Sequence, residues 1–237
     1  MIHLKDLITI VIPCKNEGMT IKKTLQFLNS QIRIYDTRVI IADVSDDNEH
    51  TKYCIESQEG KNLNIDIIEG GFPAVGRNAG AKLVTTPYVL FLDADIFLID
   101  DTLLFNLMNI VSKKKTLLST CKFRTTTGEF NYVYKAFDYV QWFTKFSKPF
   151  AIGGFMLFDT IKFNELGGFN KNDKFAEDYH ISMKISPKDF YIHDEYIYTS
   201  PRRFKSKGLW YMIKMMILSY FNRNNEVFFT HDHNYWK

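Results

Sequence analysis

The sequence contains few cysteines, and they follow no pattern that builds a covalent or metal-bound framework. The three thiols, Cys14, Cys54 and Cys121, lie far apart and are odd in number. That arrangement argues against a disulfide scaffold and lacks the spacing of a metal site. We therefore expect buried free thiols and a reducing compartment.

Long apolar runs and a strong charge of one sign are also missing. No stretch reaches the ~20 apolar residues that a membrane-spanning helix needs. Residues 1–7 (MIHLKDL) place an acid too early, and an apolar run too short, for a secretory signal. The net charge is +3, with 30 Lys and Arg against 27 Asp and Glu, so no nucleic-acid partner is indicated. We expect a cytoplasmic protein.

The composition is sufficient for a large hydrophobic core. Of the 237 residues, 46% are hydrophobic, and no internal repeat or low-complexity linker divides the chain. These properties favour a single α/β domain.

A buried strand followed by two acids is the most informative feature of the chain. Residues 88–92 (YVLFL) predict a strand covered on both faces, as in the middle of a parallel sheet. Asp93 and Asp95 follow, with the small Ala94 between them, and in extended geometry both carboxylates project to the same side. Two such charges repel unless a cation lies between them, and Mg²⁺ or Mn²⁺ carrying a phosphate would fit. The alternative is that they cap the next helix, expected to open at Asp100 or Asp101.

The N-terminal part of the chain predicts alternating strands and helices. Residues 7–12 form a buried strand that Pro13 ends, apolar residues then recur at helical spacing over 21–32, and residues 39–42 form a strand stopped by Asp43. Ligands bind at the carboxyl ends of strands in open parallel sheets. Asp43 is therefore placed to accept a hydrogen bond from a nucleobase or a ribose hydroxyl.

Two segments between strands carry open alternatives. Residues 43–48 are rich in acceptors, which also suits an N-cap before a surface helix over 49–58. After a strand over 65–68, small residues at 74–82 surround Arg77. This arginine either binds a ligand carboxylate or phosphate or pairs with a nearby Asp, and the residues alone favour the ion pair.

The second half is richer in aromatic residues. We expect a helix over 100–114, a strand over 117–123 and, over the aromatic stretch 130–150, a helix packed on the sheet rather than a dedicated sugar platform. A strand over 151–158 follows, whose glycines permit close backbone approach to a ligand. Residues 177–178 are acids at the start of a probable helix, where N-capping alone would explain them.

The last informative stretch is basic and then apolar. Residues 198–208 carry four cations on an expected loop, which either clamps a diphosphate or is simply solvated. Residues 209–221 predict a helix that is apolar nearly all round but too short to span a bilayer. It would lie in a membrane interface, cover the sheet or form a dimer contact.

Several of these motifs, taken in order, resemble glycosyltransferase family 2. They are residues 8–17 (ITIVIPCKNE), 40–43 (IIAD), 76–80 (GRNAG), 90–95 (LFLDAD), 167–169 (GGF) and 177–178 (ED). One departure is visible, because the family often has Asp-Gly-Ser where this chain has Asp43, Val44 and Ser45.

The resemblance implies an α/β fold of the GT-A type, a Rossmann-like mixed, mainly parallel sheet flanked by helices. Residues 1–99 would form the nucleotide-sugar-binding half, 100–207 the acceptor and catalytic half, and 208–237 a C-terminal apolar helix and tail of the same domain. It also implies a nucleoside-diphosphate sugar donor, for which we favour a UDP-sugar, a divalent Mn²⁺ or Mg²⁺, and inversion at the anomeric carbon.

The resemblance also assigns site residues. Asp178, with Glu177 beside it, would be the general base, and Asp95 with Asp93 would hold the metal. Apart from the resemblance, His180, His193, His231 and His233 are each more often surface or packing residues than ligands, although His193 or His231 could complete the metal shell. The residues expected to bind the donor are Pro13, Glu17, Asp43, Arg77, Asp93, Ala94, Gly154, Arg202 and Arg203.

Partners and alternatives follow from the same motifs. The acceptor would be a saccharide or a lipid-linked molecule in cell-surface glycan or glycolipid synthesis, with a peripheral contact to the inner membrane face and a homodimer left open. A nucleotidyltransferase is an alternative, although its Gly-rich, Lys-bearing loop is missing after the first strand. A non-catalytic sugar-nucleotide-binding scaffold subunit is another, against which the acids at 177–178 argue.

Overall fold

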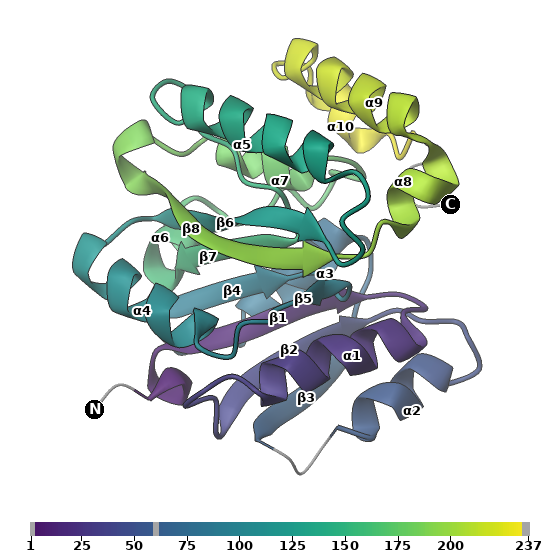
Figure 1. The fold of residues 1–237 in the computed structure, drawn as a ribbon, viewed down its shortest axis with the longest axis vertical. Helices are drawn as coiled ribbons and strands as arrows, with labels where there is room; N and C mark the ends of the chain where they lie inside the picture. The colour runs from purple at the N-terminus through teal and green to yellow at the C-terminus, as the bar shows by residue number, and fades with distance from the viewer. Residues whose placement is uncertain (1–2, 59–61, 234–237) are drawn as a thin grey trace.

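The computed structural model describes residues 3–58 and 62–233. In this part of the chain, eight strands form one sheet in the order β3-β2-β1-β4-β7-β6-β8-β5 (Figure 1). Four neighbouring strands are parallel: β1 (Ile8–Cys14), β2 (Thr37–Asp43), β3 (Leu63–Glu69) and β4 (Tyr88–Leu92). The sheet therefore begins as the expected open parallel sheet.

The remaining strands make the sheet mixed. The antiparallel strand β7 (Phe155–Asp159) joins β4 to β6 (Leu118–Thr125). Beyond it, β8 (Phe190–Thr199) runs parallel to β6, and the short β5 (Ile96–Phe97) runs antiparallel to β8. The halves on either side of β7 thus share one sheet, and the predicted fold class is confirmed.

Helices cover both faces of the sheet. Core residues of α1 (Gly18–Asn29), α2 (His50–Glu56) and α4 (Leu103–Lys114) pack on one face. Those of α3 (Pro73–Ala81), α6 (Thr160–Glu165) and α7 (Glu177–Ser182) contribute to the core on the other. The remaining helical elements are α5 (Asn131–Thr144), α8 (Arg202–Lys207), α9 (Leu209–Phe221), α10 (Glu226–Thr230) and the 3₁₀ turns Leu4–Asp6 and Pro187–Asp189.

The apolar strands explain this layering. In β1, Ile10 and Ile12 belong to one core and Val11 to the other, and all three are fully buried. Each such side chain contributes about 1.5–3 kcal/mol through burial. Helix α3 lies so close to β1 that a Cβ added at Gly80 would collide with Val11. Small residues therefore set how near α3 comes to the sheet.

Three local expectations are wrong. Pro13 does not end its strand, since β1 continues to Cys14. Strand β4 pairs only with residues 8–11 of β1, so the missing N–H of Pro13 costs no hydrogen bond to β4. The basic stretch expected as a loop forms α8, directly after Pro201, because Arg and Lys favour helix. Extended geometry also does not persist after β4, where Ile96 N–H donates to Asp93 O at 3.2 Å in a turn.

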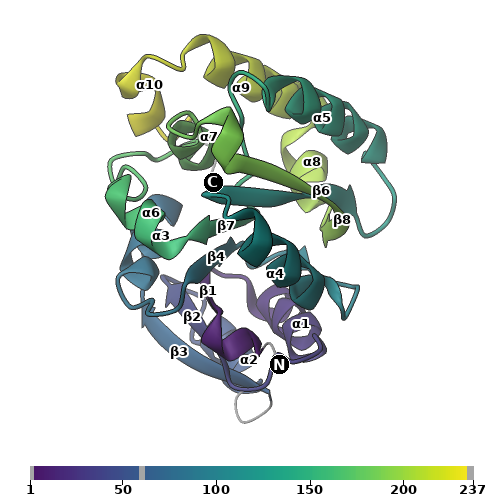
Figure 2. The same ribbon diagram turned by 90° about the vertical axis from the view of Figure 1, so that its left-hand side faces the viewer.

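The helices α5 and α9 lie side by side at one end of the molecule, away from the parallel strands (Figure 2). Both expose several large apolar side chains. Within residues 3–58 and 62–233, no helix has the length and apolar character required to cross a bilayer.

Candidate active site

Polar side chains follow the parallel strands at one edge of the sheet. Asp43 ends β2 opposite Cys14 of β1, and its Oδ1 accepts from the Ser45 N–H at 3.1 Å and from Ser45 Oγ at 2.6 Å. Val44 keeps a negative φ, so this loop closes without the glycine that the family often has there. The carboxylate nevertheless lies at the predicted strand end.

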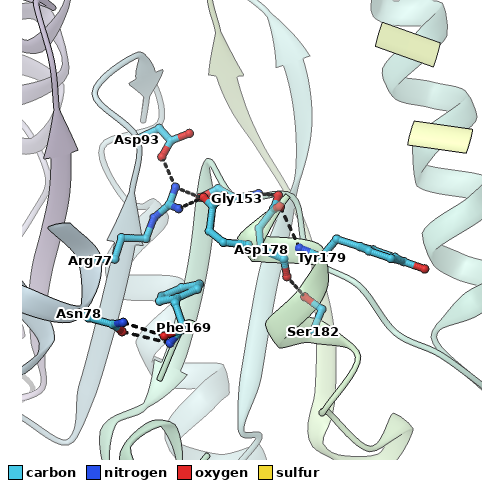
Figure 3. A network of polar contacts seen from close by, with 9 residues as sticks. Arg77, Asn78, Asp93, Gly153, Phe169, Asp178, Tyr179 and Ser182 are labelled. Carbon is cyan, nitrogen blue, oxygen red and sulfur yellow. Dashed lines mark hydrogen bonds and ion pairs between the residues drawn. The ribbon is translucent and has the colours of Figure 1, made fainter. Parts of the chain in front are cut away.

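A buried arginine connects the acids of two distant segments (Figure 3). Arg77 of α3 is 1% exposed, and its guanidinium donates to Glu177 Oε1, to Asp93 Oδ1 at 2.6 Å and to Gly153 O at 3.3 Å. The structure therefore contains the ion pair that the sequence left open for this residue. Burial lowers the pKa of Arg77, but the charges of Asp93, Glu177 and Asp178 outweigh this and raise it, so Arg77 stays protonated.

Asp178 is held by backbone groups on both carboxylate oxygens. Its Oδ2 accepts from the Gly153 N–H at 2.6 Å, and its Oδ1 from the Tyr179 N–H at 2.8 Å. A Cβ at Gly153 would lie 2.9 Å from Asp178 Oδ2, so glycine permits this approach. Burial raises the pKa of Asp178, with Arg77 and the two N–H groups opposing the shift. Because Glu177 turns to Arg77, capping of α7 does not account for the acid pair.

Asp95 lies in a second, less completely paired group. Its Oδ2 accepts from Thr199 Oγ1 at 3.4 Å. Burial raises the pKa of Asp95 to about 6, with Arg203 opposing the shift and Asp93 and Glu17 adding to it. The acids at 93 and 95 do not cap α4, because Asp100 bonds to Thr102 N–H and Oγ1 at the start of that helix.

Glu17 and Arg202 border this second group. Arg202 Nη2 donates to Glu17 Oε1 at 2.7 Å, while Glu17 Oε2 is buried and makes no hydrogen bond within the described residues. Ala94 is buried, and its carbonyl accepts from Thr24 Oγ1 at 2.6 Å. Gly154 accepts from the Asp93 N–H at 3.0 Å, which continues the β4–β7 pairing into the site.

One cavity of about 760 Å³ joins the two groups. Asp95 and Asp178 both line it, although 83 residues separate them in the chain. Its lining also includes the predicted site residues Arg77, Asp93, Gly154, Glu177 and Arg203. Pro13, Glu17, Asp43, Ala94 and Arg202 are not among the residues that line it.

The histidines do not join the acids. His193 is fully buried in β8, six residues from the Thr199 that reaches Asp95, which is roughly 20 Å along an extended strand. Its proposed metal role is therefore wrong, and burial lowers its pKa to about 4. His231 lies beside His233 after α10. Over residues 3–58 and 62–233, no three His, Cys, Asp or Glu side chains group as ligands for a metal.

Asn78 is a structural residue of the site that sequence reasoning did not assign. Its Nδ2 donates to Phe169 O at 2.7 Å, and its Oδ1 accepts from the Phe169 N–H at 3.0 Å (Figure 3). Gly168 has φ +71°, and a Cβ there would lie 2.7 Å from Asn78 Oδ1. The motifs at 76–80 and 167–169 are therefore in direct contact, which explains Asn78 in the first motif and Gly168 in the second.

Known structures share this architecture. The mannosyltransferase PcManGT from Pyrobaculum calidifontis, solved with GDP-Man and Mn²⁺, is 18% identical with a TM-score of 0.63, over 89% of this chain and 64% of that one. S. aureus TarS 1–349 with UDP-GlcNAc is 16% identical with a TM-score of 0.61, over 82% and 58%. This chain thus spans less than two thirds of either protein.

Sequence comparison identifies the family. No curated protein sequence matches the chain. The model of glycosyl transferase family 2, however, matches residues 9–171, more than half of the chain. Together with the GT-A neighbours, that match confirms the resemblance stated from the motifs. The protein belongs to glycosyl transferase family 2.

Proposed function

We propose that the protein transfers a sugar from a nucleoside-diphosphate sugar to an acceptor hydroxyl with inversion at the anomeric carbon. The observation that carries this proposal is the single cavity lined by Asp95 and Asp178. A single displacement needs a base on the acceptor side and charge neutralisation at the departing diphosphate. Asp178 can supply the base, and Asp95 can help to hold the cation that would neutralise the diphosphate.

Asp178 is the general base in this proposal. Burial raises its pKa, which makes the carboxylate a better proton acceptor than an exposed one. The hydrogen bonds from the backbone N–H groups of Gly153 and Tyr179 fix its orientation while leaving it on the cavity lining. It would take the proton of the acceptor hydroxyl as that oxygen attacks the anomeric carbon.

Arg77 and Glu177 orient this base rather than react. Glu177 is 4% exposed and pairs with Arg77, which also binds Asp93 and the carbonyl of Gly153. Arg77 thereby connects the segment after β4 to the backbone that holds Asp178. A buried charge network of this kind fixes the distance between the segment that carries Asp93 and the base Asp178.

The residues around Asp95 fit a divalent cation. Mg²⁺ is commonly held by one or two carboxylates together with substrate phosphates and water, so a complete protein cage is not required. Asp95 and Asp93 would be the ligands. Glu17, whose Oε2 makes no hydrogen bond within the described residues, lies near enough for its charge to raise the pKa of Asp95. When bound, Mn²⁺ or Mg²⁺ would neutralise charge on the leaving diphosphate.

The donor would lie over the parallel strands of the 1–99 half. Pro13, one residue before the end of β1, and Asp43, the last residue of β2, would contact the nucleoside. Arg202 and Arg203 begin α8 near the acids and would contact the diphosphate. The GDP-Man and UDP-GlcNAc complexes of the similar structures support a nucleotide-sugar donor. We favour a UDP-sugar, in a cytoplasmic enzyme of surface-glycan or glycolipid synthesis.

Donor hydrolysis and transfer test the proposal. We expect thermal stabilisation by UDP or GDP with Mn²⁺, slow release of nucleoside diphosphate from the matching sugar nucleotide, and a product of opposite anomeric configuration by NMR. Release of pyrophosphate from a nucleoside triphosphate and a sugar 1-phosphate, supplied in a separate assay, would instead indicate a nucleotidyltransferase. Binding of the donor without any turnover in the presence of acceptor mixtures would support the scaffold alternative.

A further inference from the structure

The cavity extends well beyond the acids, between two helices of the C-terminal half. Its lining continues along α5 and α9, from which it includes Val133, Phe137, Val140, Met212, Ile213, Met216 and Ile217. These side chains are apolar and come from both helices, which lie side by side in both views (Figures 1 and 2). A sugar acceptor alone does not require such a lining.

We infer that this extension binds the hydrocarbon chain of a lipid-linked acceptor, with the acceptor hydroxyl reaching Asp178. The inference rests on the proposed function, because it names the class of acceptor used at that site. One continuous cavity contains both the proposed base and the apolar interhelical lining. A molecule with a hydroxylated head and a long acyl or prenyl chain matches both ends.

The residue types in the lining favour a flexible chain. Met212, Met215 and Met216 of α9 all face the cavity, and methionine thioethers adapt to irregular apolar ligands. Phe137 and Val140 contribute from α5. The volume of about 760 Å³ lies within the range of about 300–1,000 Å³ typical of small-molecule sites.

The surface around the cavity suits a lipid source. Outside the lining, α5 exposes Trp142 and Phe143, and α9 exposes Trp210. Apart from Arg202 and Arg203 of the proposed donor site, residues 200–223 contain four Lys and Arg and no acid. Aromatic side chains and cations together favour the interface of an anionic bilayer, from which a lipid acceptor would enter.

Binding of a monomeric chain probe tests the inference. Dansylamino-undecanoic acid, used below its critical micelle concentration, is expected to bind with saturable, blue-shifted emission. Dansylglycine has the same fluorophore and carboxylate but no chain, and it should bind at least about tenfold more weakly, because each buried methylene contributes about 0.8 kcal/mol. Equal affinity for both probes would overturn the inference.

Matched charge substitutions locate the chain. Val140→Arg and Met216→Arg place a cation in the lining at positions that are 50% and 37% exposed, where folding tolerates it. Each should weaken the chain probe about tenfold or more. The control Tyr139→Arg lies on the same helix, is 69% exposed and is outside the lining, so it should leave binding unchanged. Loss in the control, or none in the lining variants, would contradict the inference.

Two further measurements distinguish lipid binding from a dimer contact and from loss of the donor site. Light scattering reports whether a dimer dissociates on Val140→Arg, which would assign the surface to a second copy and overturn the lipid inference. Donor hydrolysis by wild type and Tyr139→Arg is measured in parallel. Chain binding without donor hydrolysis would contradict the proposed function, whereas hydrolysis without chain binding would contradict only the lipid inference.

Discussion

The cavity brings together two groups of charged residues that differ in how fully they are paired. In the first, the Arg77 guanidinium is enclosed by Glu177 and Asp93, with Asp178 held nearby by backbone N–H groups. In the second, Asp95 has one long hydrogen bond from Thr199, and one buried oxygen of Glu17 makes no hydrogen bond within the described residues. Each acid of the first group is therefore held by an ion pair or by backbone N–H groups, while the acids of the second group are held less completely, although Arg202 pairs with Glu17 and the charge of Arg203 acts on Asp95.

This difference separates positioning from binding. A fully paired buried network fixes geometry and is costly to break. Burial makes carboxylates harder to ionise, and a cation that arrives with the substrate would stabilise their charged form. Substitutions in each group should therefore have different consequences.

The largest effect is expected at the proposed base. Asp178→Asn keeps an oxygen acceptor for the Gly153 N–H but removes the basic carboxylate. Turnover should fall by about 10²–10⁴-fold, with nucleotide affinity in calorimetry unchanged. A variant with near-normal turnover would mean that another group takes the acceptor proton.

Breaking the paired group should cost stability. Arg77→Met leaves Glu177 and Asp93 without their cation, and we expect a loss of about 3–5 kcal/mol in urea unfolding. The control Arg38→Met breaks an exposed pair with Asp66 and should cost less than about 1 kcal/mol. Adding Glu177→Gln to Arg77→Met should restore part of the loss, and no recovery would contradict the charge-based origin of the effect.

Neutralising the second group should instead raise stability without metal. The folded-state pKa of Asp95 is raised to about 6 from 3.8. Ionisation of this carboxylate therefore lowers the free energy of unfolding as the pH rises through that interval. Asp95→Asn should therefore gain about 1–3 kcal/mol near neutral pH and nothing below about pH 4. A stability difference that does not change with pH would argue against this origin.

Metal and a surface control sharpen the same prediction. Mn²⁺ with UDP or GDP should stabilise wild type but not Asp95→Asn, because the variant lacks the ligand charge. Asp194→Asn is a control of opposite sign, since its hydrogen bond from Lys122 lowers the pKa of Asp194 and the substitution should not stabilise. Equal Mn²⁺-dependent stabilisation of wild type and Asp95→Asn would remove Asp95 from the metal site.

The smallest effect is expected at the rim. Arg202 is half exposed, and Arg202→Gln breaks its pair with Glu17. The variant should raise KM for the donor a few-fold with little change in kcat. Lys205→Gln breaks the exposed pair with Glu129 and serves as the control, with unchanged KM. If KM for the donor is unchanged in both variants, Arg202 does not contact the donor.

The sequence allowed prediction of the acids at the carboxyl ends of β2 and β4 because these signals are local. An apolar strand followed by an acid fixes both the strand and the place of the acid, as Asp43 and Asp93 illustrate. Failures arose where a neighbouring element decides the outcome. Pro13 continues its strand because β4 pairs only with the earlier part of it, and Ile96 leaves the strand direction to pair with Thr199 of β8.

Other features were not accessible from one sequence. The Arg77–Glu177 pair joins residues 100 positions apart, and no periodicity indicates which acid an arginine will find. The position of His193, far from Asp95, depends on the direction and register of β8. The interhelical cavity depends on how α5 and α9 pack, which apolar character alone does not specify.

The Arg77–Glu177 contact also has a consequence for biosynthesis. Arg77 leaves the ribosome well before its partner, so a nascent chain that has completed β4 carries a cation destined for burial with only Asp93 available to it. Contacts of such sequence separation form late. The parallel strands can associate co-translationally, but this contact has to wait until the segment beginning at Glu177 has emerged, so the proposed site is assembled only after synthesis of that segment.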